Sequence, residues 1–351
     1  MFKKVPNNIL ILLIVLFMSV FIVSIIILKN NNSTGESNTP YGPGNNVPKS
    51  NPFGVSIDHR MTLDTRIKVA KELGVKYYRT SIVTVGASYY EPFDIKKVRD
   101  SGFQVELGIR NRSSYSGDLR DFANNPDVYP ADMNVFRTTI AKAIDDIRPY
   151  ILIIGNEAGV PDHFSGTPEQ YEQMLKVGCE VSRSKNVPCA SDGLLSGSVV
   201  FLTYYNYLET NQTDKAKSYR ERAFESWQKK YSDDEIEQRI NKLKSWISAY
   251  KNAAPDYVNM HWYVSDAQAL EESVRYMEQA VGKPVISNET GQRNEDAAKL
   301  TSIMQKYVDL NIPFVTWYSS TAGAAQPTAL QTSDGTLTNL GAAFKDFISK
   351  L

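Results

Sequence analysis

Short apolar runs alternate with amphipathic stretches along most of this chain of 351 residues. An apolar run without alternation predicts a strand buried on both faces, and apolar positions that recur every three or four residues predict a helix packed on one face. The predicted strands are 53–58, 75–82, 103–110, 151–157, 187–192, 257–264, 284–291 and 313–320. The predicted helices are 62–74, 93–102, 133–147, 167–185, 233–253, 266–281, 294–310 and 339–350.

Strict alternation of strands and helices predicts a single (β/α)8 TIM barrel of the α/β class. An open, doubly wound sheet is the alternative, but no predicted strand is followed by the Gly-rich phosphate loop of that fold. The regularity breaks once, because residues 193–233 insert roughly 40 residues after the fifth strand. They contain a Gly/Ser-rich piece, a Tyr-rich piece at 204–209 and a charged helical segment at 213–230. An insertion of this length predicts a substrate-binding wall or lid, or a merely tolerated loop.

The N-terminus lies outside this pattern. Residues 9–28 are apolar except for two serines, and this stretch is long enough to span a bilayer. Lys3 and Lys4 precede the stretch and favour an N-terminus in the cytoplasm. Residues 1–29 therefore predict a signal-anchor, a transmembrane segment that is not cleaved. The alternative is a cleaved signal peptide, whose apolar core is usually shorter and followed by a small-residue cleavage site.

The residues after this segment set the predicted domain boundaries. Residues 30–51 are rich in Asn, Ser, Gly and Pro and predict a flexible linker. Residues 52–351 then form one catalytic domain on the extracytoplasmic side of a cell membrane crossed once, or a secreted domain if the N-terminal segment is cleaved. Cys179 and Cys189 would lie on that exported side. They form either a disulfide between a helix end and the next strand or two buried free thiols.

Composition narrows the partners. The chain has 39 Lys and Arg residues and 39 Asp and Glu residues, so its zero net charge gives no sign of a nucleic-acid partner. No group of His, Cys and Asp has metal-ligand spacing, so we predict no metal and no cofactor. The expected partners are a carbohydrate substrate and, through the N-terminal helix, a membrane; the chain is expected to be a monomer.

The candidate chemistry begins at Glu157. The apolar residues 151–154 lead into Gly155, Asn156 and Glu157 with no turn signal between them. A carboxylate at the end of a buried strand is costly unless it is hydrogen-bonded or used. Glu289 ends the seventh predicted strand in the same way. Because the carboxyl ends of barrel strands converge on one face, the two glutamates are expected to face each other across the barrel mouth.

Paired carboxylates are what glycoside hydrolysis requires: one donates a proton to the leaving oxygen and the other attacks the anomeric carbon. Arg79 and Tyr263 are placed to keep Glu289 ionised by charge and hydrogen bonding. Alternatives remain for the supporting residues. Arg79 could form a structural ion pair with Glu106 or Asp58. His261 could be a histidine of the core, and Trp317 could fill the barrel core. Asp58, His59 and Asp192 could line the cleft.

The motifs GNE at 155–157, HWY at 261–263, NETG at 288–291 and TW at 316–317 resemble those of the retaining (β/α)8 glycoside hydrolases of clan A, which include the cellulase and mannanase family 5. The resemblance covers about 53–350. It implies these roles: acid/base for Glu157, nucleophile for Glu289, contact with the sugar 2-hydroxyl for Asn156, the strand-two arginine for Arg79, the strand-six histidine for His261, orientation of the nucleophile for Tyr263, and a platform under the sugar for Trp317.

One part of that pattern is absent. Family 5 members commonly carry a histidine near the end of the third strand, whereas this strand ends in Ile109, Arg110 and Asn111. The predicted function is a retaining glycosidase that cleaves β-linked O-glycosidic bonds of a polysaccharide or glycoconjugate outside the cytoplasm. A transglycosylase on the same site is one alternative. The other is a catalytically silent carbohydrate-binding barrel.

Overall fold

The computed structural model describes residues 51–80, 83–85, 93–112, 126–320 and 329–351. The chain divides into two units, Met1–Pro48 and Lys49–Leu351, and every described residue belongs to the second. The predicted signal-anchor at 1–29 and nearly all of the predicted linker at 30–51 lie outside the described residues. Within the described ranges, no helix is both long enough and apolar enough to cross a membrane.

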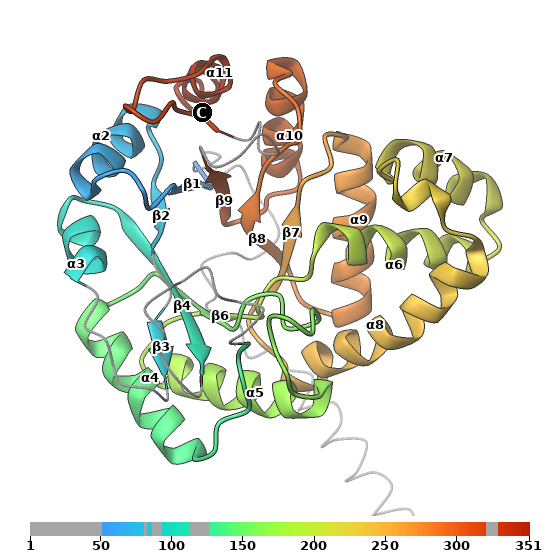
Figure 1. Ribbon diagram of the computed structural model, residues 1–351, viewed down its shortest axis with the longest axis horizontal. Coiled ribbons are helices and arrows are strands. Elements are labelled where there is room, and N and C mark those ends of the chain that lie inside the picture. Colours follow the sequence, from blue (N-terminus) through green and yellow to red (C-terminus); the bar gives the residue numbers. More distant parts are fainter. Residues whose placement is uncertain (1–50, 81–82, 86–92, 113–125, 321–328) are drawn as a thin grey trace, which may run out of the picture. The chain divides into compact units, whose positions relative to one another are not determined.

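Eight parallel strands form the predicted barrel (Figure 1). In chain order they are β1 (Phe53–Ile57), β2 (Tyr77–Arg79), β4 (Gln104–Asn111), β5 (Ile151–Ile154), β6 (Cys189–Ala190), β7 (Val258–Trp262), β8 (Val285–Thr290) and β9 (Val315–Ser319). Their hydrogen-bonded order is β6-β5-β4-β2-β1-β9-β8-β7. Isolated parallel bridges, Ala190 with Tyr257 and Leu194 with Met260, join the two ends and close the sheet. An unpredicted short strand, β3 (Val83–Val85), pairs with the far end of β4.

The predicted helices surround these strands (Figure 1). They are α2 (Leu63–Leu73), α3 (Phe93–Asp100), α4 (Met133–Ile147), α5 (Pro168–Ser184), α8 (Asp233–Ala253), α9 (Ala267–Val281), α10 (Ala297–Asp309) and α11 (Asn339–Ile348). Side-chain caps fix several starts: Thr167 and Ser232 each form a capping box at the first turn of α5 and α8. Gly74 ends α2 in the left-handed conformation, with φ 74°.

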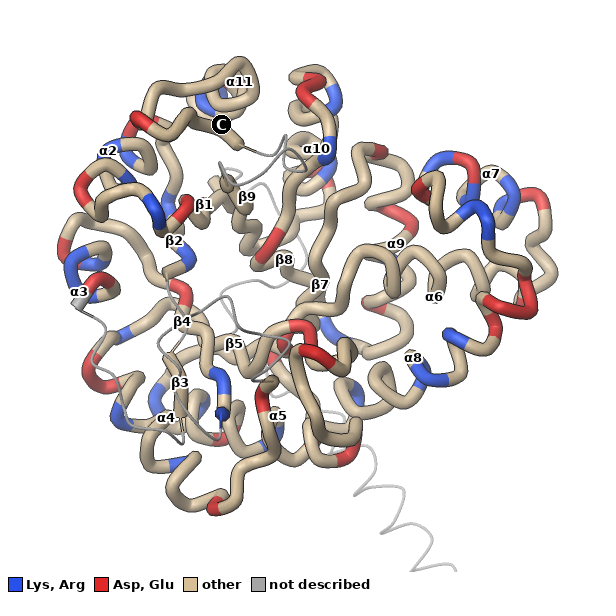
Figure 2. The backbone as a smooth tube through the Cα atoms, in the orientation of Figure 1, with Lys and Arg blue, Asp and Glu red and all other residues tan. Residues whose placement is uncertain are grey.

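The insertion after β6 is mostly helical. It contains α6 (Ser196–Glu209), α7 (Thr213–Ala223) and the 3-10 turn η1 (Gln228–Lys230). The pattern did not predict α6, because Leu195 at its N-cap position makes no capping hydrogen bond and Gly and Ser open it. Helix α6 packs against α8 and α9, and α7 packs on α6. Charged residues of both signs lie along α7 and α8 (Figure 2). Most of the insertion is therefore an outer helical layer, and a lid is not observed in it.

Two apolar layers hold the barrel together. Side chains of Tyr77, Ile151, Ile153, Ile286 and Phe314 are among those that fill the barrel interior, while alternate residues of the same strands pack against the helices. A disulfide between Cys179 and Cys189, with an S–S distance of 2.06 Å, joins α5 to β6. The alternative of two free thiols is wrong. The interior is apolar at one end, and the polar side chains described next lie toward the carboxyl ends of the strands.

Candidate active site

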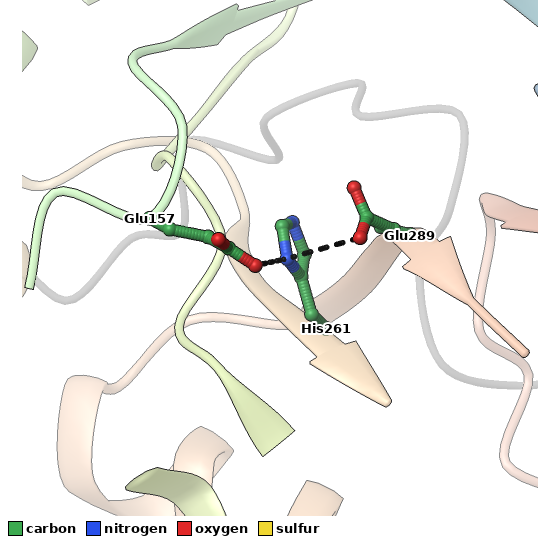
Figure 3. Close-up of side chains that lie close together, drawn as sticks. All are labelled: Glu157, His261 and Glu289. Carbon is green, nitrogen blue, oxygen red and sulfur yellow. Dashed lines mark hydrogen bonds and ion pairs between the residues drawn. The ribbon is translucent and has the colours of Figure 1, made fainter. Parts of the chain in front are cut away.

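The two glutamates meet at the barrel mouth as the sequence predicted. Glu157 follows β5, Glu289 lies on β8, and His261 on β7 stands between them (Figure 3). One oxygen of each carboxylate and one ring nitrogen of His261 all lie within 4.8 Å of one another. Two acids and one imidazole, contributed by three barrel strands, therefore share one site.

Glu157 has an uncommon backbone conformation. Its φ is 52°, in the left-handed region, which costs an L-residue about 1–2 kcal/mol. Asp192 stabilises this turn: its carbonyl accepts the Glu157 N–H at 3.2 Å, and its buried carboxylate accepts the Ala158 N–H. Burial raises the pKa of Asp192. Asp192, predicted as a possible cleft residue, thus holds the Glu157 turn from below.

Two imidazoles contact the Glu157 carboxyl. His261 Nδ1 lies 2.6 Å from Oε1, and His163 Nδ1 lies 3.2 Å from Oε2. Burial by itself lowers the pKa of His261, but the charges of Glu289 and Glu157 outweigh it and raise that pKa. His163 is not among the site residues predicted from the sequence; its only sequence signal is its position six residues after Glu157, in the same loop. Glu157 is therefore surrounded by proton-carrying groups.

Glu289 has different neighbours. Arg79 donates to its Oε2 at 2.6 Å, and the Tyr263 hydroxyl donates to its Oε1 at 2.7 Å. Burial by itself raises the pKa of Glu289, but the positive charges of His261 and Arg79 and the two hydrogen bonds lower it to about 2. Burial and the charge of Glu289 raise the pKa of Tyr263 well above its ordinary range, so its hydroxyl remains a donor. The predicted contacts of Arg79 and Tyr263 with Glu289 are present.

Arg79 also connects the rest of the site. Its guanidinium donates to the amide oxygen of Asn156 at 2.9 Å and to the carbonyl of Asn288 at 2.9 Å, and its Nε lies 3.6 Å from Glu106. The predicted site contact and the alternative of pairing with Glu106 are therefore both observed. The other suggested partner, Asp58, is buried beside Arg60 instead.

The predicted sugar platform is wrong in its placement. The Trp317 side chain is 1% exposed, and its ring lies 5.9 Å from that of Phe344 on α11, so it fills the layer between barrel and helices. Side chains alternate along a strand, and Thr316 faces the interior, where its hydroxyl lies 3.5 Å from Glu106. Tyr318, on the same side as Thr316, is half-buried, and burial and the charge of Glu289 raise its pKa. Tyr318, and not Trp317, therefore lies on the side of β9 that faces Glu289. His59, two residues after the end of β1, is exposed.

The cluster of Glu157, His261 and Glu289 has the ligand types of a metal site. However, His261 Nδ1 and Glu157 Oε1 are 2.6 Å apart, whereas two ligand atoms of a tetrahedral ion with bonds of about 2 Å lie about 3.3 Å apart. Arg79 and Tyr263 already occupy both oxygens of Glu289. These contacts fit a shared proton better than a shared metal.

Part of the chain is similar to known glycosyl hydrolases. Residues 226–344 match the family described as "Glycosyl hydrolase catalytic core", a stretch that includes His261, Tyr263 and Glu289 but not Glu157 or Arg79. No curated protein matches the chain. The match confirms the predicted enzyme class: the protein is a glycosidase.

Solved structures with a similar fold include two family GH128 glucanases. An exo-β-1,3-glucanase (subgroup VI) from Aureobasidium namibiae shows 10% identity, coverage of 84% of this chain and 96% of that chain, and a TM-score of 0.48. An endo-β-1,3-glucanase (subgroup II) from Sorangium cellulosum shows 13% identity, coverage of 84% and 97%, and a TM-score of 0.49. At these identities and TM-scores, the likenesses assign no substrate to this chain.

Proposed function

We propose that the domain is a retaining glycoside hydrolase that cleaves β-linked sugars. The observation that carries this proposal is the separation of the two acids, whose facing oxygens lie within 4.8 Å. Retaining enzymes hold their two carboxyl groups about 5–5.5 Å apart, whereas inverting enzymes need about 6.5–9.5 Å to admit a water between acid and sugar. The short separation favours direct attack by one carboxylate.

The neighbours assign the two roles. Glu289, held ionised by Arg79 and Tyr263, forms a bond to the anomeric carbon while the bond to the leaving oxygen breaks. Glu157 donates a proton to that oxygen, which keeps the electron pair of the broken bond. In the second step Glu157 takes a proton from water, the water oxygen bonds to the anomeric carbon, and Glu289 leaves as a carboxylate.

The strand positions support the narrower assignment to clan A. The acid/base follows the fourth barrel strand, β5, and the nucleophile lies on the seventh, β8. The end of β4 carries Arg110 and Asn111 where family 5 members commonly carry histidine. We therefore propose the clan and leave the family 5 resemblance at the level of shared motifs.

Export of the domain is part of the proposal. The apolar stretch at 9–28 supports a membrane anchor, and the disulfide between Cys179 and Cys189 supports folding in an oxidising compartment. Protease added to intact cells is expected to digest the domain; digestion only after lysis would contradict export.

The test uses the purified full-length chain on β-linked oligosaccharides, including the β-1,3-linked sugars named for the two glucanases. Proton NMR of the first product tells whether the anomeric configuration is retained. Glu157→Gln and Glu289→Gln are each expected to stop turnover of these substrates, while Glu180→Gln, on the outer face of α5, is the matched control. Inversion, or full turnover by Glu289→Gln, would contradict the mechanism. Transfer to an added sugar in preference to water would indicate the transglycosylase, and binding without turnover the silent barrel.

A further inference from the structure

Two buried amides lie beneath the glutamates, and their orientation can be assigned from backbone groups. Asn259 accepts the backbone N–H of Asn288 at 3.0 Å through Oδ1, and donates to the backbone carbonyl of Ser191 at 3.2 Å through Nδ2. A backbone N–H only donates and a carbonyl only accepts, so the side chain of Asn259 has one possible orientation.

The orientation of Asn288 follows from that of Asn259. Asn259 Nδ2 donates to Asn288 Oδ1 at 2.6 Å, so the oxygen of Asn288 faces Asn259. Its Nδ2 then donates to the carboxyl of Glu106 at 2.7 Å. The same Oδ1 lies 3.0 Å from His261 Nε2. An amide oxygen accepts hydrogen bonds and cannot donate them, so Nε2 of His261 must carry a hydrogen.

This tautomer decides what His261 offers Glu157. A neutral imidazole with its hydrogen on Nε2 has a lone pair on Nδ1. That nitrogen lies 2.6 Å from Glu157 Oε1, a distance that requires a hydrogen between the two atoms. The hydrogen belongs either to a protonated Glu157 or to a doubly protonated His261. In both cases the two groups together hold one proton besides the hydrogen on Nε2.

We propose that Asn288 is a positioning residue that keeps a hydrogen on Nε2 of His261, so that the Glu157–His261 pair holds the proton needed to protonate the leaving group before the reaction begins. This proposal rests on the proposed glycosidase activity. Asn288 is 2% exposed and acts through His261 without touching the substrate. If His261 were neutral with its only hydrogen on Nδ1, that N–H would donate to an ionised Glu157, and the pair would hold no further proton to give.

The space for this contact depends on Gly193, at the start of the insertion. A Cβ at this position would lie 2.2 Å from His261 Nε2 and 3.0 Å from Asn259 Nδ2, and the glycine has a φ of +91°. Residue 193 must therefore lack a side chain for the imidazole to reach the amide. This is the part of the insertion that bears directly on the chemistry.

The proton balance is simple. In the first step the proton leaves the pair through Glu157 and reaches the glycosidic oxygen as its bond to the anomeric carbon breaks, leaving neutral His261 beside ionised Glu157. In the second step the proton released by water returns to the pair. The reaction requires no other co-reactant.

The pair is expected to set the basic limb of the pH profile, because activity falls as pH rises through the apparent pKa at which the pair loses its proton. Among the residues that the structure describes, the titratable or charged groups that face this pair are Glu289, Arg79, His163, Glu106 and Arg110. All of them remain in place in the test below.

The test compares Asn288→Leu, which removes the acceptor, with Asn288→Asp, which keeps an oxygen toward His261. Burial raises the pKa of Glu106 to about 7, so its carboxyl can carry the hydrogen needed beside a new carboxylate. The chain has three histidines, so ring-nitrogen NMR of the 15N-histidine-labelled full-length protein can be assigned with His261→Asn. Hydrolysis is measured with one poor and one dinitrophenyl leaving group.

In the wild type and in Asn288→Asp, Nε2 of His261 is expected to carry a hydrogen, either in the neutral Nε2–H form or in the doubly protonated form. Asn288→Leu is expected to show a mixture that includes the neutral Nδ1–H form. Asn288→Leu should lose about 10²–10³-fold in kcat/KM with the poor leaving group, and less than about 10-fold with dinitrophenolate, which leaves without a proton. Its basic limb should move to lower pH. Thermal unfolding identifies variants that fail to fold.

A neutral His261 with its hydrogen on Nδ1 and none on Nε2 in the wild type, or an unchanged His261 in Asn288→Leu, would overturn the inference. Equal losses with both leaving groups would reduce Asn288 to a structural role and overturn it as well. The NMR result needs no activity, so a protein that hydrolyses nothing but carries a hydrogen on Nε2 of His261 would contradict the proposed function alone.

Discussion

The ends of β5 and β8 each present a glutamate to the same site. His261 stands between the two, but their backbone conformations and their other neighbours differ. Glu289 lies on strand β8, where the pairing with β7 and β9 shifts register, while Glu157 sits in a left-handed turn held by Asp192. Glu289 contacts a guanidinium that is always charged and a phenol that only donates. Glu157 contacts two imidazoles, the one side chain type whose unperturbed pKa lies near neutrality.

This difference shows how one fold obtains two roles from one residue type. A permanent cation stabilises the ionised carboxylate and so favours a nucleophile. A titratable neighbour shares a proton and so favours an acid that later becomes a base. The partners of each glutamate therefore determine its role. Arg79 comes from β2 and His261 from β7, while His163 lies in the same loop as Glu157.

Removing each carboxylate and adding azide tests whether the two glutamates have different roles. Glu289→Ala is expected to lose on the order of 10⁴-fold or more in kcat, because no other group can attack. Azide entering in place of Glu289 should give a glycosyl azide of inverted configuration. A product with retained configuration, identified by NMR, would show that Glu289 is not the nucleophile.

Glu157→Ala is expected to lose about 10²–10⁴-fold with unactivated substrates and much less in the first step with a dinitrophenyl leaving group. The covalent intermediate should then accumulate, because no base activates water, and mass spectrometry can detect it. Azide should restore turnover and give a product of retained configuration. Equal losses for both leaving groups would remove the distinction between the two glutamates.

Arg79→Gln should raise the pKa of Glu289 toward that of an ordinary carboxyl, while His261 and Tyr263 continue to lower it. The wild-type pKa of Glu289 is lowered to about 2 from an ordinary 4.5, so its stabilising interactions are complete above pH 4.5 and are lost as the pH falls toward 2. The variant should lose roughly 3–5 kcal/mol in free energy of unfolding at pH 7 and less at pH 3, measured by urea unfolding. The acidic limb of kcat/KM should move to higher pH. Arg79→Lys keeps the charge and is expected to show a smaller shift.

His163→Gln is expected to have the smallest effect on catalysis, less than about 10-fold in kcat/KM, since an amide can still donate to Glu157 Oε2 and His261 retains the other oxygen. Steady-state kinetics across pH measure it. A loss as large as that of Glu157→Ala would make His163, and not His261, the main proton partner.

Local patterns were sufficient for the fold and for the two acids. Apolar runs and helical periodicity predicted eight strands and eight helices, because the face that each segment buries is visible in the spacing of its own apolar residues. Glu157 and Glu289 could be found since parallel strands of a barrel end on one face. The missed helix α6 lacked a capping signal, and β3 is three residues long.

Only the tertiary structure decided the surroundings of the acids. Trp317 and Tyr318 are adjacent in sequence, and the register of β9 alone turns the first toward α11 and the second toward the mouth. A series of hydrogen bonds of about 3 Å runs from Ser191 through Asn259 and Asn288 to His261, and it joins residues from the ends of three strands. The positions of the two carboxylates follow from the sequence alone, because each strand can be recognised from its own residues and the strands of a barrel end on one face. Their protonation states depend on the closed barrel, because hydrogen bonds between distant segments leave no local pattern in the sequence.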